Sequence, residues 1–503
     1  MKELSDKKRI ALNLAAAICA SFTTVCIGFF LLPFIVRTIG IEAQGFLQLA
    51  SNFASWAALA TAAINSMAGR FITIAIQQND VEKAGKYYTS LFWGNLFIFA
   101  VFLLPILLFV LNLEKVINVP AHLLFDVKLL FALVFINFFL SNVFSVWSNT
   151  FYITNTPYWQ SIGNAISTLI RAAAIFVLFS SLTAKVYYSA LAALAVTAFN
   201  ASWGLWHKNK LLPELKVKRF LFSLAHLREL FASGIWRSLQ STGEMLLYGL
   251  NLLVCNLLIN PTMMGILALS KTIPLVLADL NWQIATTFAP QLTIRFAKGD
   301  KGSILSELRR ACKINAIVGT IPLAGFLIFG KEFFTLWVPN QDAGLLQTLS
   351  VLACFGLLLV SGLQPIGNVF ATVNKVRPLA LSVIISGIIN VAAIFAFLNF
   401  TDLGVYAIAG VSTVITIIRH IFYTIPAAAR YLGFKWNAFF FGFGYSIIGS
   451  LAVSAIGFAV KLAIKPDDWL SLIACCAITG IIGLLANTFI IFSKDERERI
   501  WRR

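Results

Sequence analysis

Residues 10–36 read IALNLAAAICASFTTVCIGFFLLPFIV, an uncharged and largely apolar stretch that already indicates the class of protein. About 20 consecutive apolar residues are enough for a helix to cross a bilayer, so this stretch is long enough to span. The nine residues before it contain four cations, and no small-residue cleavage site stands out after it. We therefore interpret it as a first transmembrane helix and not as a cleaved signal peptide.

The composition of the whole chain agrees with this interpretation. Of its 503 residues 59% are hydrophobic and 12% are charged, and the mean hydropathy is +0.84. An ordinary soluble domain carries roughly 25% charged residues. Too little polar surface remains to coat a soluble fold of this size, which excludes a soluble enzyme, a nucleic-acid-binding protein and a disordered scaffold. The sequence predicts an all-α polytopic membrane protein without a nucleic-acid partner.

Further apolar runs of spanning length follow along the chain. Together with the first they predict about 14 transmembrane helices, the sixth centred near Leu194 and the seventh near Leu246. We expect two six-helix lobes followed by an extra helix pair. The predicted parts are an N-terminal lobe (1–206), a basic cytoplasmic linker (207–228), a C-terminal lobe (229–430), and a helix pair with a basic tail (431–503).

The net charge of +18 is informative about topology. With the N-terminus in the cytoplasm, 27 of the 39 Lys and Arg residues fall in cytoplasmic segments and 7 fall on the other side. Because cytoplasmic loops carry the excess of cations, this bias predicts that both termini are cytoplasmic. Five cations remain inside the predicted spans, namely Arg70, Arg171, Arg237, Lys271 and Arg419.

The sequence also contains a weak internal repeat. At an offset of 220, Gly45, Thr73, Asp80 and Asn95 match Gly265, Thr293, Asp300 and Asn315; at an offset of 219, Asn149, Phe151 and Asn155 match Asn368, Phe370 and Asn374. An offset of six helices preserves orientation, so the halves are expected to be parallel repeats with a cavity between them.

No catalytic or metal-binding pattern is present. The chain has no P-loop, no nucleophile elbow and no carboxylate pair in an external loop, and its four histidines are scattered. We therefore expect no enzymatic activity, no bound metal and no cofactor.

Charges inside the membrane are the candidate functional residues. Each costs at least ~2.5–3.5 kcal/mol at a helix centre, so each normally faces a cavity or a partner. The five cations outnumber two well-buried anions, Glu244 and Asp279. This surplus needs an anionic guest, lipid headgroups or water, and it predicts a cationic cavity lined by the five cations.

Each of these residues also has a plainer interpretation. Arg70 and Arg419 lie near cytoplasmic helix ends, where a long side chain can reach the headgroups. Arg37 is either an interfacial anchor or an outer-gate residue. Glu244 and Asp279 either pair with nearby cations or bind H⁺ or Na⁺ as coupling groups.

Several segments, taken in order, resemble a known family. They are LLPFIVRTIG (31–40), GFLQLA (45–50), AGRF (68–71), GILALS (265–270) and GVYAIAG (404–410). This order is similar to that of the multidrug/oligosaccharidyl-lipid/polysaccharide (MOP) exporter superfamily, and most similar to its polysaccharide-transport branch of Wzx-type flippases.

The resemblance implies a function in polysaccharide biosynthesis. Members of this branch move undecaprenyl-pyrophosphate-linked oligosaccharides, such as O-antigen units of lipopolysaccharide, across the bacterial inner membrane. It implies alternating access, contact with membrane lipids, coupling to H⁺ or Na⁺, and a possible link to polysaccharide polymerase machinery. A lipid II-type flippase and a MATE-like H⁺/Na⁺ drug antiporter are the alternatives.

Overall fold

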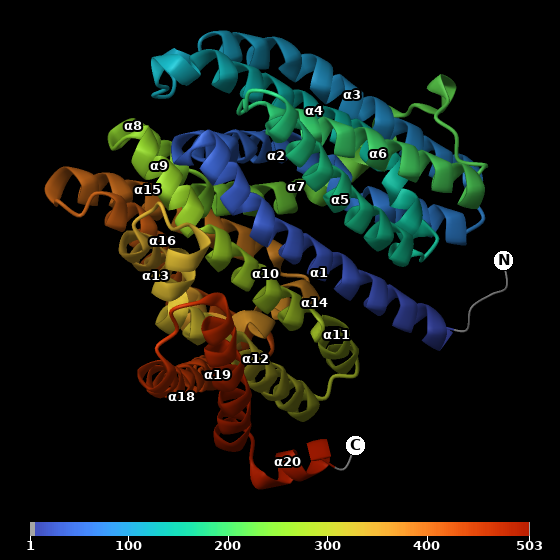
Figure 1. Cartoon of the computed structure of the whole chain (residues 1–503). Helices are drawn as coiled ribbons and strands as arrows, with labels where there is room; N and C mark the ends of the chain where they lie inside the picture. Colours follow the sequence, from blue (N-terminus) through green and yellow to red (C-terminus); the bar gives the residue numbers. More distant parts are fainter. Residues whose placement is uncertain (1–5, 502–503) are drawn as a thin grey trace. The chain divides into compact units, whose positions relative to one another are not determined.

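The computed structural model describes residues 6–501, and the described part consists of helices and loops (Figure 1). The first ten elements are α1 (Asp6–Ile39), α2 (Ile41–Gln77), α3 (Val81–Leu111), η1 (Leu113–Lys115), η2 (Ala121–Leu123), α4 (Leu124–Ile153), α5 (Pro157–Ser181), α6 (Tyr188–Leu211), η3 (Arg219–Leu221) and α7 (Leu224–Glu244). The predicted all-α polytopic fold class is confirmed.

The remaining elements continue the helical pattern with more interruptions. They are η4 (Met245–Gly249), α8 (Asn251–Leu258), α9 (Pro261–Ser270), α10 (Thr272–Thr286), α11 (Ala289–Ala297), α12 (Lys301–Trp337), α13 (Ala343–Val360), η5 (Ser361–Ile366), α14 (Gly367–Thr372), α15 (Val376–Phe400), α16 (Val405–Arg419), η6 (His420–Thr424), α17 (Ile425–Tyr431), α18 (Phe441–Ile464), α19 (Trp469–Ile491) and α20 (Lys494–Trp501). Both η4 and η6 are π-helical turns.

Twelve helical segments of the described chain are long and apolar enough to cross a membrane. The predicted count of about 14 is therefore approximate, and the two segments that fall short are α6 and the stretch from α7 to α8. α7 carries Arg228, Glu229, Arg237 and Glu244 within 21 residues. Charges at this density lower the apolar character of the helix below that of its neighbours.

The chain forms two compact units. Unit 1 comprises the chain up to Thr242 together with 256–265, and unit 2 comprises 243–255 together with the chain from Ile266 onward. The boundary between the units thus falls between Thr242 and Gly243, in the last turn of α7. α7 packs within unit 1, where a Cβ on Gly234 would collide with the Ala63 carbonyl oxygen of α2. Only glycine allows this approach.

Equivalent residues of the repeat have the same local roles in the two units. Asp80 and Asp300 are the N-cap residues of α3 and α12, and each carboxylate accepts a backbone N–H of the first turn. Asn155 (φ 54°) and Asn374 (φ 56°) both adopt the left-handed conformation after a helix end. Asparagine tolerates this conformation better than most residues. The two halves therefore share turn and cap chemistry as well as weak sequence similarity.

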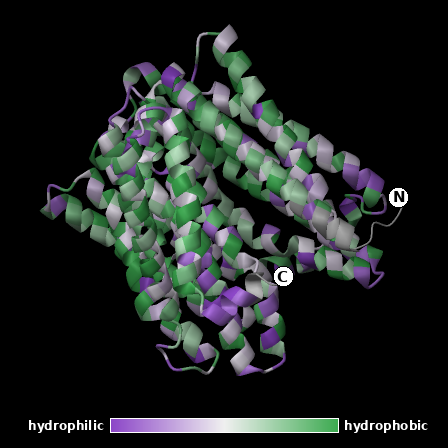
Figure 2. Cartoon of the chain, turned by 60° about the horizontal axis from the view of Figure 1, so that its bottom comes forward, coloured by the Kyte–Doolittle hydropathy of each residue, from purple (hydrophilic) through white to green (hydrophobic). Residues whose placement is uncertain are grey.

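The hydrophobic residues divide between packed cores and the outer surface. In unit 1, Ile72, Leu91 and Leu230 join α2, α3 and α7. Other large apolar side chains remain outside, such as Phe97 of α3, which is 69% exposed. Figure 2 shows that hydrophobic residues cover much of the helix bodies, whereas hydrophilic residues collect mainly at helix ends and loops. An apolar exterior of this kind suits a multi-pass membrane protein.

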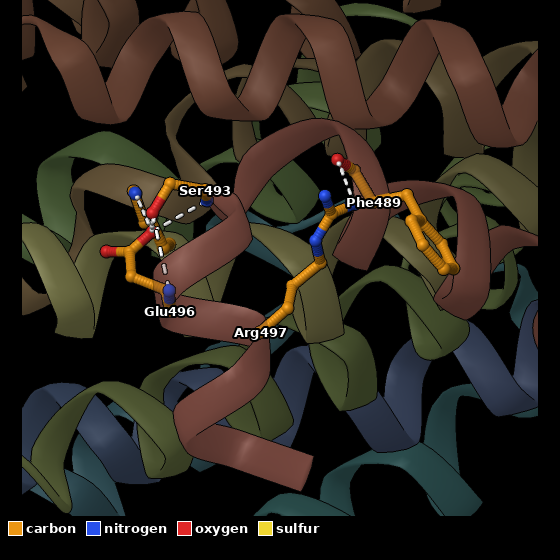
Figure 3. A network of polar contacts seen from close by, with 5 residues as sticks. Phe489, Ser493, Glu496 and Arg497 are labelled. Carbon is orange, nitrogen blue, oxygen red and sulfur yellow. Dashed lines mark hydrogen bonds and ion pairs between the residues drawn. The ribbon is translucent and has the colours of Figure 1, made fainter.

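The last described helix, α20, is held by a small polar network (Figure 3). Glu496 accepts a hydrogen bond from Lys313 at 2.6 Å and from the Ser493 backbone N–H at 2.8 Å. Arg497 donates to the Phe489 carbonyl at 3.2 Å. Burial alone would raise the pKa of the Glu496 carboxyl, but Lys313 and Ser493 hold that pKa below its usual value. The network fixes α20 against α12 and the end of α19.

Candidate functional site

The four predicted site cations of unit 1 lie on different helices. Arg37 lies in the last turn of α1, Arg70 on α2, Arg171 on α5 and Arg237 on α7. All four side chains are exposed. Within the described residues of the chain, none of the four is joined to a carboxylate by an ion pair. The charge of each is therefore left for solvent, lipid headgroups or a bound anion.

Asn65, a polar residue of α2, takes part in packing between helices. Asn65 and Asn95 exchange amide hydrogen bonds at 3.0 and 3.1 Å, and Asn95 also donates to the Asn142 carbonyl at 3.1 Å. These bonds tie α2, α3 and α4 together. Asn95 is 1% exposed, so its amide is satisfied inside unit 1 and not by a ligand.

Unit 2 contains the equivalent amide bridge. Asn315 of α12, which the repeat pairs with Asn95, donates to the Ser361 carbonyl and to the Asn281 side chain of α10. Ser361 begins the 3₁₀ helix η5, in which its carbonyl also accepts the N–H of Gln364, three residues further on. Asn315 therefore adds bonds that join α12 to η5 and to α10.

Lys271 lies at a break in the eighth predicted span. This span is divided into α9, α10 and α11, and Lys271 stands between the first two. Pro274 cannot donate to the Ser270 carbonyl, and the Ser350 hydroxyl donates to it instead at 2.6 Å. Lys271 is half-buried near Cys255, and no acceptor among the described residues pairs with its ammonium.

Glu244 and Arg419 come together in unit 2. Glu244 immediately precedes the π-helical turn η4, and Arg419 immediately precedes η6. Both side chains are half-buried, and Glu244, Tyr248 and Tyr423 are the ionisable groups that act on the Arg419 guanidinium. The Arg419 Nε atom is buried without a hydrogen-bond partner in the described structure. Single π-turns recur at functional sites, which makes this cluster a candidate for function.

The polar stripe that begins at Glu244 continues against α16. Tyr248 Oη lies 2.6 Å from Thr416 Oγ1, and Asn251 donates to Ser412 Oγ at 3.1 Å and to the Ile408 carbonyl at 3.2 Å. Asn251 is 1% exposed, so this end of the stripe holds two helices together. Helical spacing identifies the stripe in the sequence, but spacing contains no information on which helix it faces.

Asp279 is exposed on α10, and no ion pair joins it to Lys271 or to another cation of the described chain. No group of three or more His, Cys, Asp or Glu side chains gathers as a metal site in the same part. Of the eight predicted site residues, the structure thus brings only Glu244 and Arg419 into one cluster within a unit. Tyr248 and Tyr423, which complete this cluster, were not predicted from the sequence.

Comparison with known sequences gives one relative that covers the chain almost completely. It is the uncharacterized membrane protein EpsK of Bacillus subtilis (strain 168), which is 26% identical over 500 residues and aligns with 98% of each chain. No family model matches the sequence.

Comparison with solved structures identifies the fold. The inward-facing conformation of a multidrug resistance MATE family transporter of the MOP superfamily has a TM-score of 0.66 at 13% identity, covering 88% of this chain and 98% of the other. The lipid II flippase MurJ in its inward closed conformation has a TM-score of 0.66 at 12% identity, covering 98% of this chain and 100% of the other. The chain is therefore a multi-pass membrane protein with the fold of MOP-superfamily transporters and flippases.

Proposed function

We propose that this chain flips an undecaprenyl-pyrophosphate-linked oligosaccharide across the bacterial inner membrane. One observation carries the proposal: Arg70, Arg171, Arg237 and Lys271 lie on membrane helices or beside them, and none has a carboxylate partner in the described structure. Uncompensated cations in an apolar setting are costly unless an anion meets them. A pyrophosphate group joined to a lipid tail provides such an anion from within the bilayer.

The known proteins with this fold are compatible with such a cargo. MurJ is named a lipid II flippase, so the fold can move a lipid-linked headgroup. We propose alternating access between two six-helix lobes, with the five cations, including Arg419, forming the substrate-binding set. In this proposal both termini are cytoplasmic, Arg37 guards the outer mouth, and polysaccharide polymerase machinery receives the product.

Glu244 and Asp279 are the proposed coupling groups for H⁺ or Na⁺. Glu244 lies in the Arg419 cluster, so a change in its charge changes the environment of a substrate-binding cation. Asp279 is exposed and unpaired in the described chain, as a group that exchanges ions with water needs to be.

Reconstitution tests the proposal directly. Proteoliposomes would contain a fluorescent undecaprenyl-pyrophosphate oligosaccharide, and a membrane-impermeant quencher would report which leaflet holds it. A charge-assisted hydrogen bond contributes about 1.5–3 kcal/mol, so Arg171→Ala and Arg237→Ala should each slow flipping about tenfold to a hundredfold. Arg219→Ala, an exposed cation of η3, is the control and should flip normally.

Full flipping by both variants would refute the cationic-site proposal. The drug antiporter makes a different prediction for the same vesicles. It expects H⁺- or Na⁺-driven movement of a cationic dye that Glu244→Gln abolishes, whereas the flippase proposal expects no dye transport in the unaltered protein.

A further inference from the structure

Unit 1 contains a small, partly open pocket between α4, α5 and α6. Its volume is about 190 Å³. Sites for drug-sized ligands usually measure about 300–1,000 Å³. At roughly 30 Å³ per water molecule, this pocket holds about six waters, which is the space of one small ring and its substituents.

The pocket wall is polar but uncharged. Its polar lining consists of hydroxyls and amides: Ser141, Ser145 and Ser148 from α4, Gln160 and Asn164 from α5, and Thr197 and Asn200 from α6. No charged side chain is among the lining residues described for it. A wall of this kind offers many neutral hydrogen bonds and no electrostatic attraction for an ion.

Several of these groups have unused hydrogen-bonding capacity. The side chains of Gln160 and Asn164 are exposed, and neither bonds to another described residue. Asn200 Oδ1 accepts from Ser167 at 2.6 Å, which fixes the amide and leaves its NH₂ group to donate. The pocket therefore presents both donors and acceptors to a guest, and one of them is held in a fixed orientation.

Trp203 supplies an aromatic surface beside these groups. Its Nε1–H donates to the Trp159 carbonyl at 3.1 Å, and the His207 ring packs 4.6 Å from its own ring. A Cβ on Gly163 would lie 2.9 Å from the indole, so glycine is required for α5 to approach it. An indole held in this way can stack on the apolar C–H face of a sugar ring while amides and hydroxyls bind the ring hydroxyls.

The pocket also shares a helix face with a predicted substrate-binding cation. Asn164, Ser167 and Arg171 follow one another on α5 at three- and four-residue steps. Arg171 is thus seven residues, or about 10 Å of helix, from Asn164. A sugar in the pocket and a phosphate at Arg171 could belong to one headgroup.

We infer that this pocket binds one neutral sugar residue of the cargo, an inference that rests on the proposed function and names the part of the substrate it recognises. Neutral donors and acceptors together with a fixed indole match a polyhydroxylated ring. A cationic drug would instead be favoured by an acidic lining, and a free phosphate by a basic one.

Ligand-observed saturation-transfer NMR on the full chain in nanodiscs tests the pocket. The probes are methyl glycosides of glucose, galactose and N-acetylglucosamine, with tetraphenylphosphonium and inorganic phosphate for comparison. At least one glycoside should bind, and Asn164→Leu should weaken it about two- to tenfold, as expected for one lost neutral hydrogen bond. Gln160→Leu should act similarly. Ser161→Ala, whose hydroxyl bonds only to Pro157 of its own helix, is the matched control and should leave binding unchanged.

The flipping assay separates the two proposals. The double variant Gln160→Leu/Asn164→Leu should slow the glycan-bearing lipid at least fivefold and leave bare undecaprenyl pyrophosphate unaffected. If flipping proceeds but no glycoside binds, or if both lipids slow equally, the sugar pocket is refuted and the flippase remains. If glycosides bind at the pocket but no lipid flips in the unaltered protein, the proposed function fails on its own.

Discussion

Asn95 of unit 1 and Asn315 of unit 2 occupy equivalent positions in the repeat, but they join different partners. Asn95 exchanges bonds with Asn65 and donates to the Asn142 carbonyl, which joins the continuous helices α2, α3 and α4. Asn315 donates to the Asn281 side chain and to the Ser361 carbonyl, which joins α12 to α10 and to the 3₁₀ helix η5. The same side chain joins continuous helices in one unit and interrupted helices in the other.

This difference extends through the two units. In unit 1 the helices α1 to α5 are each continuous, and the predicted site cations are exposed. In unit 2 the helices are interrupted at Lys271, at η4, at η5 and at η6. At the first three interruptions Ser350, Asn390 and Asn315 donate side-chain hydrogen bonds to backbone carbonyls. Broken helices inside a membrane protein persist only where such groups satisfy the freed backbone. Unit 2 is therefore the part in which polar side chains support interrupted helices.

Removing an arginine should give the largest difference between the units in the loss of unfolding free energy. Arg419→Ala removes a half-buried cation on which Tyr248, Glu244 and Tyr423 act, and we expect it to destabilise the protein by about 1–3 kcal/mol. Arg70→Ala removes an exposed cation with no ion-pair partner in the described structure, so its effect should stay within about 0.5 kcal/mol. Denaturant unfolding in detergent measures both free energies.

The double variant Arg419→Ala/Glu244→Ala provides the control for this contrast. Because the two charges attract each other, the stability loss in the double variant should be smaller than the sum of the losses in Arg419→Ala and Glu244→Ala. Additive losses would show that Glu244 and Arg419 do not interact.

The loss of the amide bridges should give a smaller difference in stability between the units. Asn315→Ala leaves the amide oxygen of the buried Asn281 without a donor in the described structure, whereas Asn95→Ala leaves Asn65 half-buried and still bonded to the Thr61 carbonyl. An unsatisfied buried acceptor costs about 1–3 kcal/mol, so Asn315→Ala should be more destabilising than Asn95→Ala by that amount. The same unfolding measurement tests this difference, and equal losses would contradict the role given to the Asn281 amide.

At the α9–α10 break, Ser350 and Pro274 allow a test of whether a side chain replaces the backbone hydrogen bond that a proline cannot make. Ser350→Ala removes the donor to the Ser270 carbonyl and should cost about 1 kcal/mol. Pro274→Ala restores a backbone N–H that can bond to this carbonyl, so Ser350→Ala should cost less in that background. Additive effects of the two substitutions would show that the hydroxyl does not substitute for the missing N–H.

Apolar run length and repeat spacing were sufficient to predict the fold class, because spanning helices need long apolar segments whatever they pack against. The same reasoning gave about 14 spans, and α6 and the α7–α8 stretch are the two segments that do not reach the apolar character of the other twelve. Both are helical, but α7 carries four charged residues and lies against α2 and α3 within unit 1. The sequence indicates how long each helix is. Whether a face of that helix contacts lipid, water or another helix depends on tertiary packing.

The candidate site was less predictable for the same reason. Glu244, Tyr248 and Asn251 lie at helical spacing in the sequence, but their partner helix α16 lies more than 150 residues further along the chain. The pocket between α4, α5 and α6 was not predicted, because its serines and amides are dispersed over three helices. Their types are individually unremarkable in a membrane helix, and only the fold places them together.

Removing an ion pair at the surface should change stability least. The pKa of Glu496 in unit 2 is lowered chiefly by its hydrogen bond from Lys313, against the effect of burial, and Glu114 in unit 1 has a lowered pKa beside Lys128. A carboxyl with a depressed folded pKa stabilises the folded state fully above its unfolded pKa of about 4.3. This stabilisation is lost as the pH falls through the folded pKa.

Hydrogen exchange at α20, corrected for its intrinsic pH dependence, measures this effect. At pH 7, Glu496→Gln should raise exchange at α20 by no more than about fivefold, because partly exposed pairs contribute up to about 1 kcal/mol. Below the folded pKa the variant and the unaltered protein should exchange alike, since both then carry a neutral side chain. Glu114→Gln is the unit 1 control and should leave α20 unchanged at every pH. If the difference at α20 persisted below the folded pKa, shape rather than charge would hold α20, and the contribution of Lys313 would be steric.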